Sequence, residues 1–302
     1  MRRGARSTLL GALPESFPAA LCVVLHTSPD SPRVLVDILR SKTRLAVKYA
    51  ENDESIQTGS VYVAPPNWHL LVRDSRLGLG RGPRENRHRP AADPLFRTAA
   101  LAYGSRTIGV ILTGNLDDGS RGLMAVKQAG GVAIVQDPAD APFPGMPQAA
   151  LNSVAVDYTV RLSEIAPLLG RLVEEDLPGK SEQSTAALER DSKDSGVYTC
   201  PECGGPLSEF NGDRVPYYRC RVGHAYSPQS MLGAQQELVE NSLWAAVVSL
   251  QQQAEINRRL AHDARQAGRK HSAPHFQDRA KNAARHAEVV QSMLTSSAEG
   301  WP

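Results

Sequence analysis

The chain has 302 residues, of which 41% are hydrophobic, enough for one sizeable core and a smaller appendage. Its formal charge of +2 provides no bulk electrostatic attraction to nucleic acid or to an anionic membrane. The longest apolar run, 19–25, is far shorter than the ~20 residues of a membrane-spanning helix, and no long apolar segment follows the basic N-terminus. We therefore expect a cytoplasmic protein without nucleic-acid binding, membrane insertion or a signal peptide.

Residues 1–175 form the first predicted domain, in which short apolar runs alternate with segments of helical periodicity. Strands are expected at 19–26, 60–64, 70–73, 108–112 and 132–135, and helices at 33–42, 95–103, 120–128 and from 148 onwards. The glycine-, arginine- and proline-rich segment 76–94 is predicted to be a loop. Strands separated by helices predict an α/β fold with a doubly wound parallel sheet.

The stretch 107–131 places two carboxylates where such a sheet carries its chemistry. An apolar strand is followed by Asp117 and Asp118, and a helix begins at Ser120. In open parallel sheets, reacting groups gather at the carboxyl ends of the strands. His26 ends another strand, and a histidine oriented by a carboxylate can take a proton from a hydroxyl nucleophile. The alternative is that one of the aspartates caps the helix and that His26 is an ordinary strand-end histidine.

The charged, unpatterned stretch 176–196 predicts a linker, followed by a cysteine–histidine module at 197–228. The module combines a Cys-x-x-Cys pair with a third cysteine that lies four positions before a histidine. Three sulfur ligands and one imidazole suit a closed, tetrahedral site for a structural Zn²⁺ ion. The expected ligands are Cys200, Cys203, Cys220 and His224. The alternative is a redox-active cysteine pair with an incidental histidine.

Residues 229–297 predict an α-helical hairpin of two helices, 229–266 and 274–296. Apolar residues recur on each helix at three- and four-residue steps. The first stripe is Val239, Leu243, Val247 and Leu250, and the second is Phe276, Ala280, Ala283, Ala287, Val290 and Leu294. Helices that pack only on each other, and a surface for a partner or a second copy, both fit this pattern.

Five segments of the first domain occur in a specific order: LPESFPAALCVVLH, GSVYVAPPNWHLLV, NRHRPAADPLF, IGVILTGNLDDGSRGLMAVKQAGG and VQDPADAPFPGMPQAAL. Over residues 19 to about 173 they resemble the catalytic domain of the bacterial chemotaxis protein-glutamate methylesterases. The resemblance implies a doubly wound α/β sheet that hydrolyses glutamyl methyl esters with a serine, a histidine and an aspartate, and without a catalytic cofactor. His26 and Asp118 match the histidine and the aspartate, while His69 and His88 lie in matching loops along the substrate groove.

The resemblance also implies partners. Methylated chemoreceptors or related sensor proteins are the expected substrates, and a methyltransferase or sensor kinase of the same system is a further candidate partner. The zinc module and the helical hairpin are the tail that we expect in the stand-alone branch of this family, where the linker makes them a movable docking arm.

The nucleophile is the one departure from the family pattern. In the family, the serine lies in a Gly-Ala-Ser-x-Gly-Gly turn between the first strand and the first helix, which here falls just before Met1. Ser7 lacks the flanking glycines and maps inside the first helix. We therefore expect an N-terminally truncated domain whose nucleophile lies upstream of Met1, because a lost core strand would expose apolar surface on its neighbours. A genuinely shortened chain is the other explanation.

Two hypotheses follow from the sequence. The first is a carboxylic ester hydrolase of the methylesterase family, with His26 as general base and Asp118 orienting it. The second is a catalytically inactive, methylesterase-like interaction protein with a zinc-stabilised docking tail.

Overall fold

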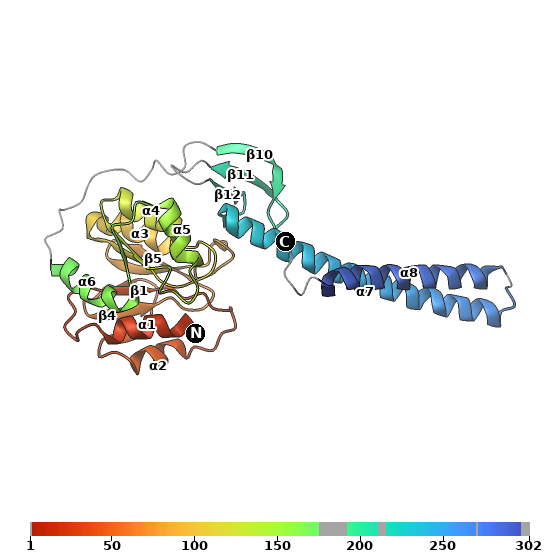
Figure 1. Ribbon diagram of the computed structural model, residues 1–302, viewed down its shortest axis with the longest axis horizontal. Helices are drawn as coiled ribbons and strands as arrows, with labels where there is room; N and C mark the ends of the chain where they lie inside the picture. Colours follow the sequence, from red (N-terminus) through yellow and green to blue (C-terminus); the bar gives the residue numbers. More distant parts are fainter. Residues whose placement is uncertain (1, 175–191, 211–215, 270, 297–302) are drawn as a thin grey trace. The chain divides into compact units, whose positions relative to one another are not determined.

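A computed structural model describes residues 2–174, 192–210, 216–269 and 271–296 (Figure 1). The chain forms two compact units, Met1–Met231 and Leu232–Pro302. Of the expected linker 176–196, residues 176–191 lie outside the described residues. Residues 192–196 belong to strand β10 (Ser192–Thr199) and not to a linker.

Six short strands of the first unit form two parallel, three-stranded sheets. The orders are β1-β4-β2 and β7-β8-β9, and every pair within them is parallel. The strands are β1 (Leu21–Val23), β2 (Ala46–Tyr49), β4 (Ser60–Val63), β7 (Ile108–Ile111), β8 (Val132–Gln136) and β9 (Tyr158–Val160). The parallel pairing confirms the predicted α/β class.

Six helices cover these strands in two groups (Figure 1). Helix α1 packs against α2 and α6 in one group, and α4 packs against α3 and α5 in the other. The helices are α1 (Arg2–Gly11), α2 (Leu35–Arg40), α3 (Ala92–Tyr103), α4 (Ser120–Gln128), α5 (Gly145–Ser153) and α6 (Leu162–Glu174), and a 3₁₀ turn, η1 (Gly104–Arg106), follows α3. Strands that alternate with helices in two groups give the doubly wound arrangement.

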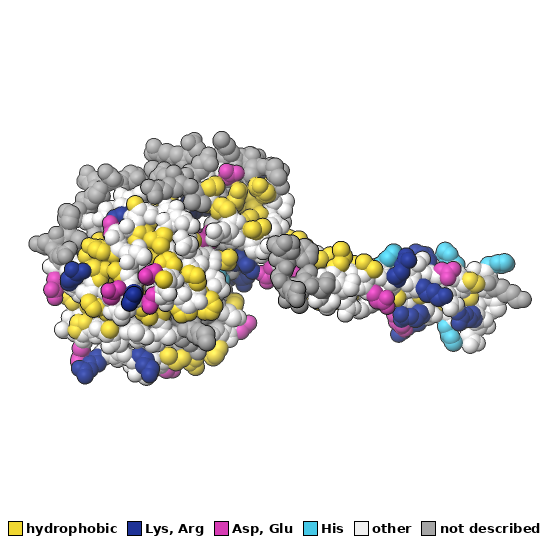
Figure 2. Space-filling view, in the orientation of Figure 1, with side chains coloured by type: hydrophobic (Ala, Val, Ile, Leu, Met, Phe, Trp, Pro, Cys, Tyr) yellow, Lys and Arg dark blue, Asp and Glu magenta, His cyan; other side chains and the backbone are white. Residues whose placement is uncertain are grey.

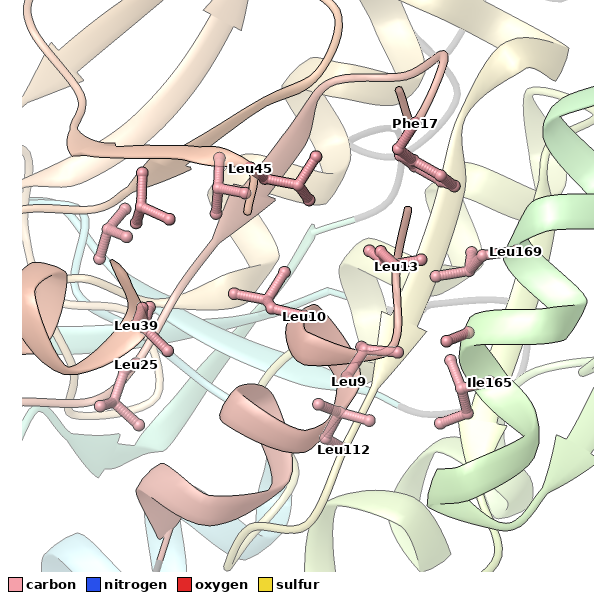
Figure 3. Packing of buried hydrophobic residues seen from close by; sticks show 14 of the residues in the cluster. Leu9, Leu10, Leu13, Phe17, Leu25, Leu39, Leu45, Leu112, Ile165 and Leu169 are labelled. Carbon is pink, nitrogen blue, oxygen red and sulfur yellow. The ribbon is translucent and has the colours of Figure 1, made fainter. Parts of the chain in front are cut away.

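The largest hydrophobic cluster lies under the first group of helices (Figure 3). Helix α1 contributes Leu9 and Leu10, which are 8% and 2% exposed, and the segment after it adds Leu13 and Phe17. They pack with buried residues of α2, α6 and the two parallel sheets. The aliphatic periodicity of α1 therefore anchors it to the sheet strands, although half of the helix is polar.

The segment 76–94 corrects one prediction, because its first part is a strand. β6 (Arg76–Gly80) pairs antiparallel with β5 (His69–Arg73) and with the short β3 (Glu54–Ser55). The β5–β6 turn is formed by Asp74 and Ser75, both with positive φ, the conformation that suits a two-residue hairpin turn. Composition suggested a loop, but Leu77 alternates inward and is 1% exposed.

The remaining strands of the first unit form a small antiparallel sheet in the order β10-β11-β12-β13. The additional strands are β11 (Pro206–Phe210), β12 (Tyr217–Cys220) and β13 (Ala225–Tyr226). The expected ligands stand in the two turns at one end of this sheet, Cys200 and Cys203 before β11, and Cys220 and His224 around the β12–β13 turn.

Two long helices follow, α7 (Pro228–Gln266) and α8 (Ser272–Ser296), and α8 returns along α7 in Figure 1. Ala280, Ala283 and Ala287 of the predicted α8 stripe are buried, whereas Val239 of the α7 stripe is 46% exposed. Figure 2 shows Lys, Arg and His side chains gathered toward the end where α7 turns into α8. None of the described helices combines the length and apolarity needed to cross a membrane.

Candidate active site and metal cluster

His26 follows β1, and Asp118 lies in the turn between β7 and α4. Their side chains meet, with His26 Nε2 2.6 Å from Asp118 Oδ2. Both are withdrawn from solvent, with 10% of the His26 side chain and 1% of the Asp118 side chain exposed. Because a carboxylate only accepts hydrogen bonds, the imidazole carries its hydrogen on Nε2. The nitrogen that can take a proton from a nucleophile is then Nδ1.

Three further donors hold the Asp118 carboxylate. The backbone N–H of Ala92 donates to Oδ2 at 2.6 Å, and that of Asp93 to Oδ1 at 3.4 Å. The side-chain amide of Asn86 donates to Oδ1 at 3.1 Å. Burial by itself would raise the pKa of Asp118, but hydrogen bonds from His26, Ala92 and Asn86 lower it to about 2. Asp118 is therefore an ionised carboxylate that orients the imidazole of His26.

Helix capping, the alternative role for Asp118, is not what the structure shows at α4. The N-cap of α4 is Gly119, and no side chain caps it. Instead, Asp93 from α3 accepts a hydrogen bond from the Gly122 N–H in the first turn of α4, at 2.6 Å. The two helix N-termini thus each face a carboxylate supplied by the opposite segment, an arrangement that the helix dipoles favour.

Asn86 and Asp93 are the site residues that the sequence analysis missed. Both are buried, and the Asn86 amide also donates to Asp93 Oδ2 at 2.8 Å. Burial and the neighbouring charge of Asp118 raise the pKa of Asp93 to about 7. One signal was available in the sequence, since an aspartate just ahead of the expected helix at 95–103 is a common first-turn residue.

The two loop histidines have different environments. The ring of His88 stacks on that of His26, with centroids 3.7 Å apart and planes at 4°. His69 is 4% exposed, and its Nε2 donates to Pro83 O at 2.9 Å while its Nδ1 accepts from Ala91 N at 3.3 Å. Burial lowers the pKa of His69, which favours the neutral ring. His69 therefore ties two loops together, and it also lines a hollow of about 760 Å³, so its role in substrate binding stays a prediction.

The loop after β7 carries a backbone shaped by close packing. Leu116 has a φ of 61°, and a Cβ at Gly114 would approach Met146 Sδ to 2.1 Å. The Gly114 N–H donates to Phe143 O at 2.9 Å, so it is not available to stabilise an oxyanion. Ser7, the N-terminal serine considered as a nucleophile, lies inside α1 as expected.

The parallel strands leave one space unfilled at the centre of the domain. Within the described residues, β1 pairs only with β4, and β7 pairs only with β8. Because His26 and Asp118 meet, the carboxyl ends of β1 and β7 lie at the same edge. Between them lie two hollows of about 240 and 530 Å³ that share mainly apolar lining residues and one arginine: Ala19, Ala20, Cys22, Leu95, Phe96, Ile108, Val173 and Arg106. The space is flanked by two strand edges.

The four expected ligands form a cluster in the small sheet. Their ligand atoms all lie within 4.8 Å of one another. The sulfur atoms of Cys203 and Cys220 are 3.7 Å apart, and His224 Nδ1 lies 3.5 Å from Cys220 Sγ and 3.7 Å from Cys200 Sγ. These separations match the edge of about 3.8 Å of a tetrahedron with metal–sulfur bonds of ~2.3 Å. The four residues can therefore hold a metal ion.

A carboxylate supports the histidine of this cluster. His224 Nε2 lies 3.2 Å from Glu202 Oε2, while its Nδ1 faces the sulfur atoms. Metal-binding histidines commonly donate their second ring nitrogen to a carboxylate, which fixes the ring orientation. The cysteines are free thiols, and the 3.7 Å sulfur separation is far beyond a disulfide bond of ~2.05 Å.

The pH dependence of stability provides a test of the His26–Asp118 geometry. A depressed pKa contributes stability above the unfolded value and loses it as pH falls through the folded value. We expect the free energy of unfolding of the chain to exceed that of the Asp118→Asn variant near neutral pH, and the difference to narrow below about pH 4. The contribution of Asp93 to the free energy of unfolding has the opposite sign, because a group with a raised pKa loses stability as pH rises. Urea unfolding at several pH values measures the difference, and a constant difference would contradict the assignment.

Comparisons with known proteins identify the family of the first domain. The family model described as CheB methylesterase matches residues 4–169. A putative protein-glutamate methylesterase/protein-glutamine glutaminase of Leptospira interrogans is 41% identical over 174 residues, covering 57% of this chain and 90% of the relative. A protein-glutamate methylesterase/protein-glutamine glutaminase of Pyrococcus abyssi is 38% identical, over 53% of this chain and 45% of its own length.

A solved structure gives the same result. The crystal structure of the Thermotoga maritima CheB methylesterase catalytic domain matches with a TM-score of 0.55 and 34% identity, over 57% of this chain and 93% of that chain. The family match ends inside α6, so the small sheet, α7 and α8 lie beyond it. Because the family model spans more than half of the chain, and because the Leptospira relative is matched over nearly its whole length, the chain belongs to the CheB methylesterase family.

Proposed function

We propose that this chain carries the general base, His26, and the orienting acid, Asp118, of an esterase that hydrolyses glutamyl methyl esters of methylated chemoreceptors or related sensor proteins once a nucleophilic serine is supplied beside His26. The observation that carries the proposal is the 2.6 Å contact between His26 Nε2 and Asp118 Oδ2, with Asp118 held by three further donors. A fixed, ionised carboxylate keeps the imidazole in one tautomer and stabilises the imidazolium that forms during acyl transfer.

The proposed nucleophile is a serine at the carboxyl end of an additional strand between β1 and β7. Within the described residues each of these strands has one paired edge, and the space between them is lined mainly by apolar side chains. A strand added there in the parallel direction would end beside His26, because the carboxyl ends of β1 and β7 share one edge. Leu9 of α1 and Leu112 after β7 belong to one core cluster, so α1 packs in the same core as the strand β7 that would flank the added strand (Figure 3).

The reaction then follows the acyl-transfer scheme. The serine Oγ attacks the ester carbonyl carbon while His26 takes its proton, and the C–O bond to the methoxy group breaks as His26 returns that proton to give methanol. Water, deprotonated by His26, hydrolyses the acyl-enzyme and releases the glutamate side chain. Every proton passes through the one imidazole, so its orientation by Asp118 matters in both steps.

We propose His88 as the substrate-binding histidine of this site. Its ring covers one face of the His26 imidazole, which places it within reach of a group bound at His26. A half-buried neighbour of the base can still contact a bound substrate, while the stacking limits rotation of the base. His69 is buried and bound to two backbone groups, and it stays a predicted substrate-binding residue because it lines a hollow of the same domain.

We further propose that the metal ion of Cys200, Cys203, Cys220 and His224 is a structural Zn²⁺ ion in a zinc-ribbon-like module. The donor set of three thiolates and one imidazole favours zinc over harder cations. All four ligands come from the protein, which leaves no position for a substrate. The cytoplasmic location stays a prediction that agrees with free thiols.

The second candidate function is an inactive, methylesterase-like interaction protein that docks through the α7–α8 hairpin. It is favoured by large apolar side chains exposed on α7. They are Leu238, Val239, Trp244, Val248, Ile256 and Leu260. Exposed apolar residues repeated along one helix are typical of a partner surface.

Release of methanol from a methylated receptor separates the two candidates. The assay compares the chain itself with a form extended by an apolar strand and a Gly-Ala-Ser-Thr-Gly-Gly turn ahead of Arg2. The enzyme hypothesis expects methanol only from the extended form, and none when its turn serine is replaced by alanine. A folded extended form that releases no methanol would favour the interaction protein.

A further inference from the structure

Asn86 occupies a central position between two parts of the first unit. It is 6% exposed, and its side-chain amide donates to Asp118 Oδ1 at 3.1 Å and to Asp93 Oδ2 at 2.8 Å. A flipped amide would point its oxygen at both carboxylates, so only one orientation satisfies the site. The position of Asn86 therefore determines whether its amide can donate to the Asp118 carboxylate.

The oxygen of the same amide is bound from the other side, by the start of α7. Asn86 Oδ1 accepts from Ser230 Oγ at 3.2 Å and from Ser227 N at 3.3 Å. Ser230 is fully buried, and it forms a reciprocal capping pair with Ser227, in which each hydroxyl accepts from the other residue's N–H. All hydrogen-bonding positions of the Asn86 amide are thus used.

The backbone around Asn86 is joined to strand β13 of the metal-binding module. The Asn86 N–H donates to Ala225 O at 2.9 Å, and the Ala225 N–H donates to Arg84 O at 3.3 Å. Ala225 directly follows the ligand His224. The guanidinium of Arg121 in α4 also lies over the ring of Tyr217 in β12, 3.3 Å from its centroid.

A small cavity of about 60 Å³ lies along the same contact. Its lining includes Asp117, Ser120 and Tyr217, whose Oδ1, Oγ and Oη atoms are buried and have no hydrogen-bond partner within the described residues. The cavity has room for water, which could satisfy these atoms. The hydrogen bonds of Asn86, Ala225, Ser227 and Ser230 therefore make this contact a specific interface between the module and the α/β domain.

We propose that the metal-binding module, residues 197–230, is a positioning element of the active site, which holds Asp118 and thereby His26 through the hydrogen-bonded chain Ser230–Asn86–Asp118. Loss of the metal releases β13 and the first turn of α7, so that Asn86 loses the two donors on its oxygen and no longer fixes the carboxylate. The inference rests on the proposed function only in taking Asp118 as the orienting acid and zinc as the metal.

The Nε2–H proton of His26 reports whether the hydrogen-bonded series Ser230–Asn86–Asp118 is intact, and it does so without any substrate or nucleophile. NMR of the full chain labelled with ¹⁵N-histidine measures the rate at which this proton exchanges with water. The exchange rate in the unsubstituted chain is compared with the rates in four variants: Ser230→Ala, Asn86→Ala, the double variant, and the control Ser242→Ala. Ser242 is also on α7, and its hydroxyl donates only to Leu238 O within its own helix.

We expect Ser230→Ala, and separately the removal of zinc by a chelator, to raise the exchange rate about fivefold. In the Asn86→Ala background, Ser230→Ala should add nothing, because the chain is already broken. The proposal is overturned by a Ser230→Ala rate equal to that of Ser242→Ala, by additive effects of the two substitutions, or by an unchanged rate after zinc removal. If the Asn86→Ala variant does not fold, the exchange rates of Ser230→Ala and of the zinc-free chain are sufficient to test the proposal. Methanol release plays no part in these readouts, so failure of the esterase proposal remains distinguishable.

Discussion

Replacement of His26 by alanine in the strand-extended chain lowers kcat for methanol release by about 10⁴-fold or more, with a smaller change in KM. The reason is that, among the described residues, His26 is the group that we propose to move the proton in both half-reactions, while substrate contacts elsewhere stay intact. Asp118→Asn lowers kcat by a similar factor, about 10⁴-fold, because an amide can turn its NH₂ toward the ring and select the wrong tautomer.

A matched control for these variants is His275→Ala, a histidine exposed on α8. It should leave kcat and KM unchanged. Circular dichroism and urea unfolding check that each variant is folded. A loss of less than tenfold in folded His26→Ala protein would show that another group is the base, whatever the distance between the side chains of residues 26 and 118.

Replacement of Cys203 by serine removes the bound metal and unfolds the small sheet β10–β13. Structural zinc contributes about 10–16 kcal/mol of apparent binding free energy in small zinc modules, far more than the packing of such a short sheet provides. The buried apolar core of this sheet is small and consists chiefly of Leu207, Tyr217 and Tyr226. A metal ion held by the four residues would therefore supply the largest stabilising contribution in this part of the chain.

Metal content by mass spectrometry and the dispersion of amide resonances from 199–226 measure the two effects. Cys22→Ser is the matched control, since Cys22 lies in β1 away from the four ligands, and it should keep one equivalent of zinc. Full metal content in folded Cys203→Ser protein would contradict the ligand set. Loss of metal with an intact sheet would contradict its structural role.

Local patterns predicted the elements with strong periodicity and clear end signals. Helix α4 begins and ends at the predicted residues, because Gly119 precedes it and Gly130-Gly131 stops it. The β5–β6 hairpin was missed, because its turn uses Asp74-Ser75 and its second strand contains glycine and arginine. Composition is a weak guide where a strand has one buried face and one exposed face.

The sequence by itself determined the α/β class, the family and the four metal-ligand candidates, since these depend on residue types at fixed spacing. It also indicated His26 and Asp118, which a strand-end position and a resemblance were enough to single out. Only the tertiary structure decided which groups hold Asp118, because Asn86, Ala92 and Asp93 reach it across the chain through backbone amides and one side-chain amide. Likewise, only the structure gave His69 its two backbone partners and brought Ser230 to Asn86 from 144 residues away. Hydrogen bonds between distant segments depend on how the layers pack, and no local pattern in the sequence encodes that.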